Sequence, residues 1–530
     1  MDRLIRKLSG DLQQGRISRR NFMSMALAAG ASLGAASMLA DRAMASTPQK
    51  GGRFRLGMAH GSTSDSLDPA TFSSGFTLNL ANTFGNQLSE IAPDGSLKGE
   101  IAESFEPSAD AVTWRCTLRK GIEFHNGKTL TAADVIASLQ HHLGEDSKSG
   151  AKGLLSQIES FATDGPDTVI FTLKSGNADF PFLLSEYRVV IMPEKDGKMD
   201  WSEGVGTGPY ILENFDPGVR ATFKRNPNYW KEGRAHFDEV ELNSILDATA
   251  RQNALLTGAV DAIDSVEVKT AHLLARNQGV KMLEVTGYLH YTMPMDMSQA
   301  PFDNRELAMA LKLSADREAM LEKVLFGHGA VGNDHPISPA NRFFAKDLPQ
   351  REIDLDKAKF HFDKSGIGST QLDLRVSEAA FIGSDTAALI LQESAAKIGL
   401  NINVIREPAD GYWDQVSLVK PWYCSYWGGR PTEDWMFEIG YAAEANWNQS
   451  RWKNERFNEL LVAARVELDD AKRRVMYEEM QGLVRDDCAT IIPLFANHVM
   501  ALQSNVHHGE HVAGNWQLDG GKASERWWFA

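Results

Sequence analysis

Cysteine is the scarcest residue of this 530-residue sequence, with three copies, Cys116, Cys424 and Cys488. Three thiols cannot make a disulfide framework, although one pair could form in an oxidising compartment. We expect them to be buried free thiols. The sequence also has no Cys-x-x-Cys pair, no His-Glu-x-x-His motif and no Walker loop. These absences remove the commonest redox, zinc and nucleotide-binding interpretations.

A catalytic constellation is missing as well. The Gly-x-Ser-x-Gly pattern at residues 30–34 follows no strand and falls in a segment that we expect to be removed. The Gly-rich pattern at 327–332 follows a predicted helix, 317–326, instead of opening one. His125 lies in a predicted tight turn, where a structural role is expected. We therefore expect a protein that is not an enzyme and carries no cofactor.

Long hydrophobic runs are absent beyond the first 45 residues. The apolar run at 23–40 contains mostly Ala, Gly, Ser and Met, which makes a poor permanent membrane span. It follows the twin-arginine pattern Ser-Arg-Arg-Asn-Phe-Met at 18–23 and precedes the small-residue site Ala43-Met44-Ala45. This order predicts a twin-arginine (Tat) signal peptide over 1–45, cleaved after Ala45, and a soluble product in the periplasm.

The remaining 485 residues contain 48 Lys and Arg against 67 Asp and Glu, a net charge of −19. Such a surface repels nucleic acid and anionic lipid, so neither is an expected partner. The length is enough for two or three domains with substantial cores.

Strand-like and helix-like segments alternate along the mature chain, which indicates an α/β fold. No internal repeat and no low-complexity linker separates them, so we expect intertwined domains. The predicted strands are 112–118, 168–173, 400–405 and 491–502, and the predicted helices are 131–142, 356–364, 387–398 and 454–485, the last split near 469–470.

Several sequence blocks resemble those of one protein family. The longest is WRCTLRKGIEFHNGKTLTAADVIASL at 114–139, and shorter ones lie at 66–69, 206–210, 225–230, 301–304, 316–317 and 356–359. Together they resemble the large peptide, opine and nickel solute-binding proteins of ABC importers, called bacterial extracellular solute-binding family 5. The resemblance spans nearly all of the mature chain.

The resemblance implies two α/β lobes joined by a hinge, with a small domain inserted into the first lobe and a ligand enclosed between the lobes. It places lobe I at 46–95, 190–290 and 495–530, the inserted domain at 96–189 and lobe II at 291–494, with hinges near 290 and 495. It also implies a monomer that delivers a peptide-like or opine-like solute to a membrane permease. Two alternatives stay open: a metal-chelate or haem binder on the same scaffold, and a Tat-exported cofactor enzyme.

Arg430 is the residue on which the ligand hypothesis depends. It lies in a Gly-Gly-Arg-Pro turn with aromatic residues on both sides, and a planar guanidinium suits capture of a carboxylate or phosphate. In resembling peptide binders this segment carries an Asp for the ligand's amino group, and a second segment carries an Arg where this chain has Glu378. The inverted signs predict an anionic or zwitterionic ligand anchored by Arg430. The alternatives are a solvated Arg430 and an internal pair with Asp434.

Aromatic residues are dense around this turn. Six of the twelve Trp fall within forty residues, at 413, 422, 427, 435, 447 and 452, and large aromatics make ligand-enclosing walls at low entropic cost. The expected wall residues are Trp413, Trp427, Tyr426, Trp422, Phe381 and, from lobe I, Phe72. The cluster of His507, His508, Glu510 and His511 resembles a metal site, but on a strand His508 would point away from His507 and His511. We expect an exposed cluster that binds no metal, with a nickel or zinc site as the alternative.

Overall fold

The computed structural model describes residues 19–29 and 48–530. Within the predicted signal peptide it describes one helix, α2 (Arg19–Ala28). The rest of the predicted signal peptide, including the cleavage site at Ala45, lies outside the described residues. None of the described helices combines the length and the hydropathy that crossing a membrane requires.

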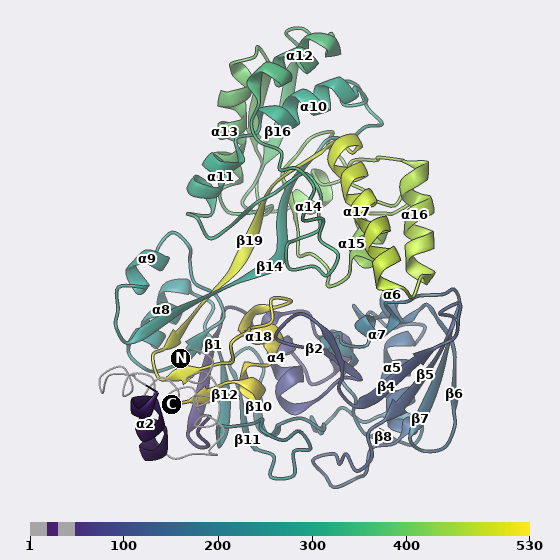
Figure 1. Cartoon of the computed structure of the whole chain (residues 1–530), viewed down its shortest axis with the longest axis vertical. Coiled ribbons are helices and arrows are strands. Elements are labelled where there is room, and N and C mark those ends of the chain that lie inside the picture. The colour runs from purple at the N-terminus through teal and green to yellow at the C-terminus, as the bar shows by residue number, and fades with distance from the viewer. Residues whose placement is uncertain (1–18, 30–47) are drawn as a thin grey trace.

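A mixed nine-stranded sheet runs through the molecule and joins its lower and upper parts (Figure 1). Its strand order is β10-β11-β12-β1-β13-β19-β14-β18, and β15 pairs with β19. The bounds are β1 (Arg53–Met58), β10 (Tyr210–Asp216), β11 (Arg220–Arg225), β12 (Glu239–Ser244), β13 (Ala262–Ile263), β14 (Val280–Pro294), β15 (Gly329–Val331), β18 (Ser425–Trp427) and β19 (Thr490–Gln503).

Lobe I is the left and central part of the lower body in Figure 1, built around β1 and its neighbours, and the inserted domain lies to its right. Phe54, Leu56 and Met58 alternate along β1 and are buried in its core, because alternate side chains of a strand share one face. Helices and short strands complete this lobe. They are η1 (Pro69–Thr71), α4 (Gly75–Phe84), β2 (Ser89–Ile91), β3 (Leu97–Gly99), β8 (Glu194–Lys195), β9 (Lys198–Met199), α8 (Ala248–Leu256), α9 (Ala271–Leu274), β20 (Val506–His507), α18 (Gln517–Gly521), α19 (Ala523–Arg526) and β21 (Trp528–Phe529).

The inserted domain has its own antiparallel four-stranded sheet, in the order β4-β5-β7-β6, and its own core. Its elements are β4 (Ala102–Pro107), β5 (Thr113–Leu118), α5 (Ala132–Leu143), α6 (Lys152–Leu155), β6 (Ile158–Thr163), β7 (Thr168–Leu173), α7 (Phe180–Leu183) and η2 (Tyr187–Val189). The Thr131 and Asp134 side chains form a capping box at the start of α5, which fixes where that helix begins. The two strands and the helix predicted in this region are confirmed.

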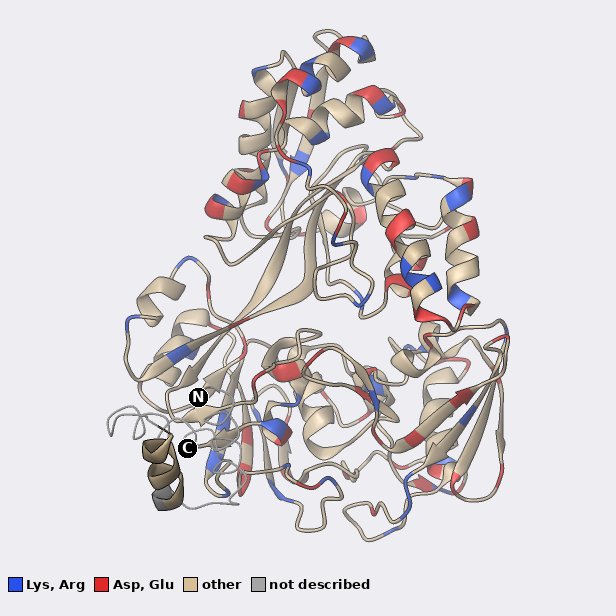
Figure 2. Cartoon of the chain, in the orientation of Figure 1, with Lys and Arg blue, Asp and Glu red and all other residues tan. Residues whose placement is uncertain are grey.

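Lobe II is the upper body, with one group of helices packed near the parallel pair β16–β17 and a second group, on the right in Figure 1, that has its own core. Its elements are α10 (Arg305–Ser314), α11 (Arg317–Val324), α12 (Leu355–Ser365), β16 (Gln371–Val376), α13 (Ser384–Ala396), β17 (Asn401–Arg406), α14 (Tyr412–Gln415), α15 (Glu433–Gly440), α16 (Glu455–Val466) and α17 (Asp470–Asp487). The predicted break near 469–470 is confirmed, because Asp469 caps α17 through its side chain. Charged residues gather on these helices, while β19 carries none (Figure 2).

The antiparallel strands β14 and β19 cross from lobe I into lobe II (Figure 1). Their pairing is regular from Val280 to Thr286, is interrupted, and resumes at His290 opposite Phe495. An interrupted ladder is locally easier to bend than a continuous one. The hinge positions near 290 and 495 and the domain limits stay predictions.

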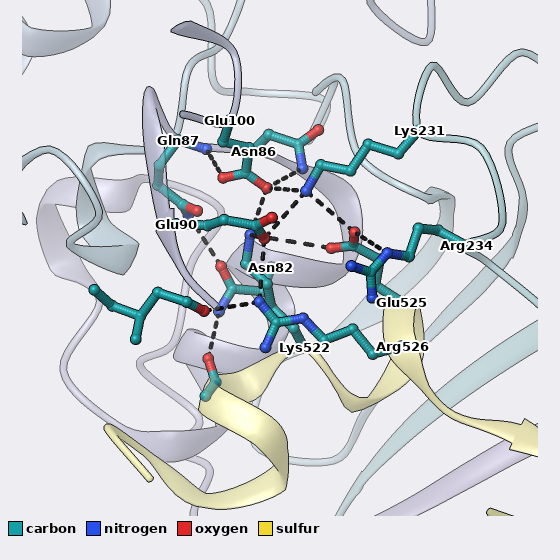
Figure 3. A network of polar contacts seen from close by, with 12 residues as sticks. Asn82, Asn86, Gln87, Glu90, Glu100, Lys231, Arg234, Lys522, Glu525 and Arg526 are labelled. Atoms are coloured by element: carbon teal, nitrogen blue, oxygen red, sulfur yellow. Dashed lines mark hydrogen bonds and ion pairs between the residues drawn. The ribbon is translucent and has the colours of Figure 1, made fainter. Parts of the chain in front are cut away.

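A buried network of charges fixes the C-terminal segment to lobe I and to the start of the inserted domain (Figure 3). Lys231 Nζ lies 2.6 Å from Glu100 Oε1 and 3.1 Å from Glu525 Oε1. Lys522 and Arg526 contact Glu90 at 3.0 and 3.1 Å. The three carboxylates lie close enough together to hold a metal ion, but the lysine ammonium groups already lie against them, so this cluster is an internally neutralised anchor.

Candidate functional site

The site is built on the turn that follows β18. β18 pairs with β14 from His290 to Thr292, and the chain then turns at Gly429, whose φ is +71°. A Cβ atom at Gly429 would lie 2.0 Å from the Tyr288 Cβ. Only glycine fits both the backbone conformation and this close approach. The turn therefore presents Arg430 beside the strand that crosses between the lobes.

Arg430 has no ion-pair partner within 4.0 Å among the residues that the structure describes. Its Nη1 donates a hydrogen bond to the Gly429 carbonyl at 2.6 Å, and its guanidinium lies 5.1 Å from the Trp435 ring centre. Its Nε is buried without a hydrogen-bond partner in the described chain. Burial lowers the pKa of Arg430, and the charge of the Glu186 carboxylate opposes that shift only in part.

Asp434, the alternative partner for Arg430, is occupied by another residue. It accepts a hydrogen bond from Arg465 Nε at 3.1 Å. Burial raises the pKa of Asp434 to about 6 even though Arg465 opposes the shift. Arg430 thus retains donors for an outside anion.

Arg430 lines three cavities of about 240, 390 and 480 Å³. The cavities adjoin one another because each pair shares a further residue, Gly428, Trp435 or Trp447. The 240 Å³ cavity, called cavity A here, has lining residues from lobe I, the inserted domain and lobe II. The 390 Å³ cavity, cavity B, is lined by lobe II alone, and the 480 Å³ cavity, cavity C, by the inserted domain and lobe II.

Cavity A contains charged groups of both signs. Glu186 and Arg188 approach it from the inserted domain and pair with each other. Arg188 Nε also donates to the Phe72 carbonyl at 2.7 Å. Burial raises the pKa of Glu186, and the Arg188 and Arg430 charges partly oppose that shift. A carboxylate and two guanidinium groups thus face one small space.

Cavity B is predominantly aromatic. Trp413 and Tyr426 are each 43% exposed and their rings meet edge to face at 5.6 Å. The Trp427 and Trp447 rings lie 5.8 Å apart, and the Trp427 indole N–H donates to Gln449 at 3.2 Å. No Asp or Glu lines cavity B. This wall is suited to apolar or planar parts of a ligand.

An ion pair joins the inserted domain to lobe II beside cavity C. Arg473 of α17 donates to both carboxylate oxygens of Asp179, at 2.8 and 2.6 Å, and each side chain is 3% exposed. The Ala178 N–H donates to the Arg465 carbonyl at 2.7 Å. These contacts form where α17 reaches the inserted domain in Figure 1. We call the Asp179–Arg473 contact the interlobe ion pair.

Comparison with known proteins identifies the scaffold. Residues 96–449 match the family model described as bacterial extracellular solute-binding proteins, family 5 Middle. The chain belongs to family 5. The resemblance found in the sequence blocks is confirmed, and the chain is a solute-binding protein of the kind that serves ABC importers.

Individual family 5 relatives match over most of their length. The glutathione-binding protein GsiB of Salmonella choleraesuis (strain SC-B67) is 24% identical over 475 residues, 87% of this chain and 91% of GsiB. HbpA2 from Haemophilus parasuis has a TM-score of 0.79 at 21% identity, covering 88% of this chain and 99% of HbpA2. AgaA of A. tumefaciens R10, solved with agropinic acid, has a TM-score of 0.71 at 23% identity, covering 90% of this chain and 99% of AgaA. The structural matches confirm the two-lobed α/β fold.

The family 5 scaffold brings together four of the predicted site residues. Arg430, Trp427, Trp413 and Tyr426 all line cavity B. Their contact with a ligand stays a prediction.

The other four predicted residues do not line cavity A, B or C. Trp422 is fully buried against Phe302 in the lobe II core, and Phe381 stacks on Tyr291 with ring centres 4.0 Å apart. The Phe72 side chain is buried in the lobe I core, and Glu378 is exposed. Packing against neighbouring hydrophobic side chains accounts for the three aromatic positions, and a ligand role for any of the four stays untested.

Sequence reasoning missed Glu186, Arg188 and Tyr288. The two charged residues sit in a short segment of the inserted domain, more than 200 positions before Arg430, and no motif marks them. Tyr288 lies within the long strand β14, and nothing in the neighbouring sequence distinguishes it from the other residues of that strand. Only the folded arrangement brings these residues to the turn.

In the described chain, no metal-sized group is formed by the side chains of His507, His508, Glu510 and His511. Glu90, Glu100 and Glu525 form the one metal-sized group of His, Cys, Asp and Glu side chains found in residues 19–29 and 48–530. His508 Nδ1 instead hydrogen-bonds the Gly509 carbonyl at 2.7 Å.

Proposed function

We propose that this family 5 protein binds a small peptide-like or opine-like solute carrying at least one carboxylate, and that Arg430 is its main polar anchor. The observation that carries the proposal is the buried Arg430 Nε, which lacks a hydrogen-bond partner in the described chain, while Arg430 forms no ion pair within 4.0 Å there. A ligand carboxylate would supply both the missing acceptor and the missing negative charge. Closure of the two lobes would then remove this contact from water.

Two relatives support the ligand class. GsiB is named for glutathione, a peptide with two carboxylates, and AgaA was solved with agropinic acid. Cavity B adds an aromatic wall beside Arg430 for the rest of the solute. In this proposal Trp413, Tyr426 and Trp427 contact the ligand's uncharged part, and the loaded monomer delivers the ligand to its ABC permease.

The experiment has two stages. Mass spectrometry of ligand released from protein purified from its own source identifies the solute, and titration calorimetry then measures its affinity for wild type, Arg430→Ala and Arg430→Lys. A charge-assisted hydrogen bond contributes roughly 1.5–3 kcal/mol, so Arg430→Ala is expected to weaken binding by roughly 10- to 150-fold. Arg430→Lys keeps the charge but loses the forked geometry, so an intermediate loss is expected.

Arg406→Ala is the matched control, because Arg406 lies on the lobe II surface and is 68% exposed at its side chain. It is expected to bind like wild type. Unchanged affinity of Arg430→Ala for the identified solute would contradict the anchor role.

We also propose that the protein reaches the periplasm by the twin-arginine route. The order of the arginine pair, the apolar run and the small-residue site supports this route. Replacing Arg19 and Arg20 together with Lys is expected to leave an unprocessed precursor in the cytoplasm, and normal export of that variant would exclude the route.

A further inference from the structure

Cavity A holds an arrangement of charges that narrows the ligand class. Glu186 and Arg188 lie on the inserted-domain side, and Arg430 lies on the lobe II side. Glu186 is too far from Arg430 for an ion pair, since none within 4.0 Å joins them among the described residues. The space between them can therefore accept the opposite ends of one ligand.

Glu186 keeps one carboxylate oxygen free although its side chain is only 9% exposed. Arg188 Nη1 donates to Oε1, and Oε2 accepts no hydrogen bond from the described residues. Glu186 Oε2 is not one of the fully buried unpartnered atoms of the described chain, so it is open to the cavity and can accept from a ligand donor that displaces water. An ammonium group is the donor that also matches its charge.

Arg188 also has an unused hydrogen-bond donor. Its Nη1 and Nε are used by Glu186 and the Phe72 carbonyl, while Nη2 donates to no acceptor in the described chain. A Cβ atom at Gly150 would lie 2.9 Å from Arg188 Nε. Glycine at this position therefore leaves the guanidinium room beside the cavity.

We propose that Glu186 is a specificity-determining residue that binds the ligand's ammonium group, while Arg430 and Arg188 each bind a carboxylate. The ligand class is then an amino dicarboxylate: one primary or secondary ammonium and two carboxylates, with a net charge of −1. This inference rests on the proposed role of Arg430. It extends that role, because Arg430 alone would accept any anion.

Charge counting gives the reason for two carboxylates. The cavity brings together two guanidinium groups and one carboxylate, a net charge of +1 on the protein side. A ligand with one ammonium and one carboxylate, the carboxylate on Arg430, leaves Arg188 sharing the Glu186 carboxylate with the ligand's ammonium. A ligand with two carboxylates and no ammonium leaves Glu186 Oε2 without a donor and places another negative charge beside it. An amino dicarboxylate satisfies all three groups.

The experiment compares matched probes on matched variants. The parent probes are glutathione and an N-(1-carboxyethyl) amino acid, each of which has two carboxylates and one amine. Each parent is paired with its N-acetyl derivative, which has no ammonium, and with a monoamide, which has one carboxylate fewer. Calorimetry measures all of them with wild type, Glu186→Gln, Glu186→Asp, Arg430→Ala and the control Glu159→Gln, which alters an exposed residue of β6.

Wild type is expected to prefer a parent probe over both of its derivatives by at least about tenfold. Glu186→Gln is expected to lose that preference over the N-acetyl derivative, Glu186→Asp to retain it, and Glu159→Gln to behave like wild type. The N-acetyl derivative also serves as a folding control, because a misfolded variant would bind both the parent probe and this derivative more weakly.

Three sets of results overturn the inference, and they differ in what they leave standing. If Arg430→Ala weakens the parent probe but wild type and Glu186→Gln share the same preference between parent and N-acetyl derivative, Glu186 does not bind an ammonium and the role of Arg430 survives. If no probe binds wild type, the amino dicarboxylate class is wrong and the role of Arg430 still depends on the identified solute. If Arg430→Ala binds the parent unchanged, the inference and the proposed anchor both fail.

Discussion

Replacing Asp179 with Asn is expected to weaken ligand binding by acting on the interlobe ion pair. The change removes the charge that Arg473 binds through two hydrogen bonds of 2.8 and 2.6 Å. Both side chains are 3% exposed, so water cannot replace the lost partner. Because the pair joins the inserted domain to lobe II, it stabilises the arrangement in which these two bodies touch.

The expected magnitude follows from the surroundings of the pair. Removing one partner of a buried ion pair costs roughly 3–5 kcal/mol. Arg473 keeps hydrogen bonds to the Ala464 carbonyl at 3.2 Å and to the Tyr477 hydroxyl at 3.3 Å. The lower end of the range therefore applies, and a loss of about 3 kcal/mol in the closed state alone weakens affinity by roughly 100-fold.

Calorimetry with the identified solute measures the affinity, and thermal unfolding without ligand measures the effect on the fold. Asp164→Asn is the matched control, because it breaks an exposed pair with Arg115 in the same domain and should change little. If Asp179→Asn binds within about twofold of wild type, the ion pair does not contribute to the ligand-bound state. If it loses as much stability without ligand as with it, the pair persists in both states and is not part of closure.

Three further perturbations test separate parts of the account. Gly429→Ala puts a Cβ 2.0 Å from the Tyr288 Cβ and should lower the free energy of unfolding by roughly 2 kcal/mol or more, whereas Gly428→Ala meets no atom within 4 Å and should unfold like wild type. Burial raises the pKa of Glu433 from 4.5 to about 7, so the folded protein holds a proton that the unfolded chain releases. The free energy of unfolding should therefore fall as pH rises from about 4.5 to 7, by roughly 3 kcal/mol at most. In urea titrations at several pH values, Glu433→Gln should make the free energy of unfolding less dependent on pH over this range. The same pH dependence in Glu433→Gln and wild type would contradict the raised pKa. Lys231→Met removes a cation that lies beside the carboxylates of Glu90, Glu100 and Glu525 (Figure 3). A denaturant titration should show a free energy of unfolding lower by roughly 3–5 kcal/mol. A variant as stable as wild type would contradict this prediction.

Much of the fold was predictable because its signals are local. Thr131 and Asp134 form the cap that their spacing predicts. The helix predicted at 356–364 is α12 (Leu355–Ser365), which ends at Gly366 in the left-handed conformation. Local hydrogen bonds and steric limits decide such boundaries, so the sequence alone carries them.

The site was predictable only in part, because side-chain exposure depends on tertiary packing. Trp413 and Trp422 are the same residue type nine positions apart, yet the first is 43% exposed on cavity B and the second is fully buried. Arg430 stood out because its unusual neighbours are adjacent in sequence. Glu186 and Arg188 did not, because only folding brings them opposite Arg430.

The most direct test of the central claim is a crystal structure of the protein with its co-purified solute. The account predicts a carboxylate oxygen within about 2.7–3.1 Å of the Arg430 guanidinium, with the solute enclosed between the lobes and its uncharged part against the cavity B aromatics. A structure in which Arg430 faces bulk water and other residues hold the solute would contradict the claim, although the family 5 assignment would stand.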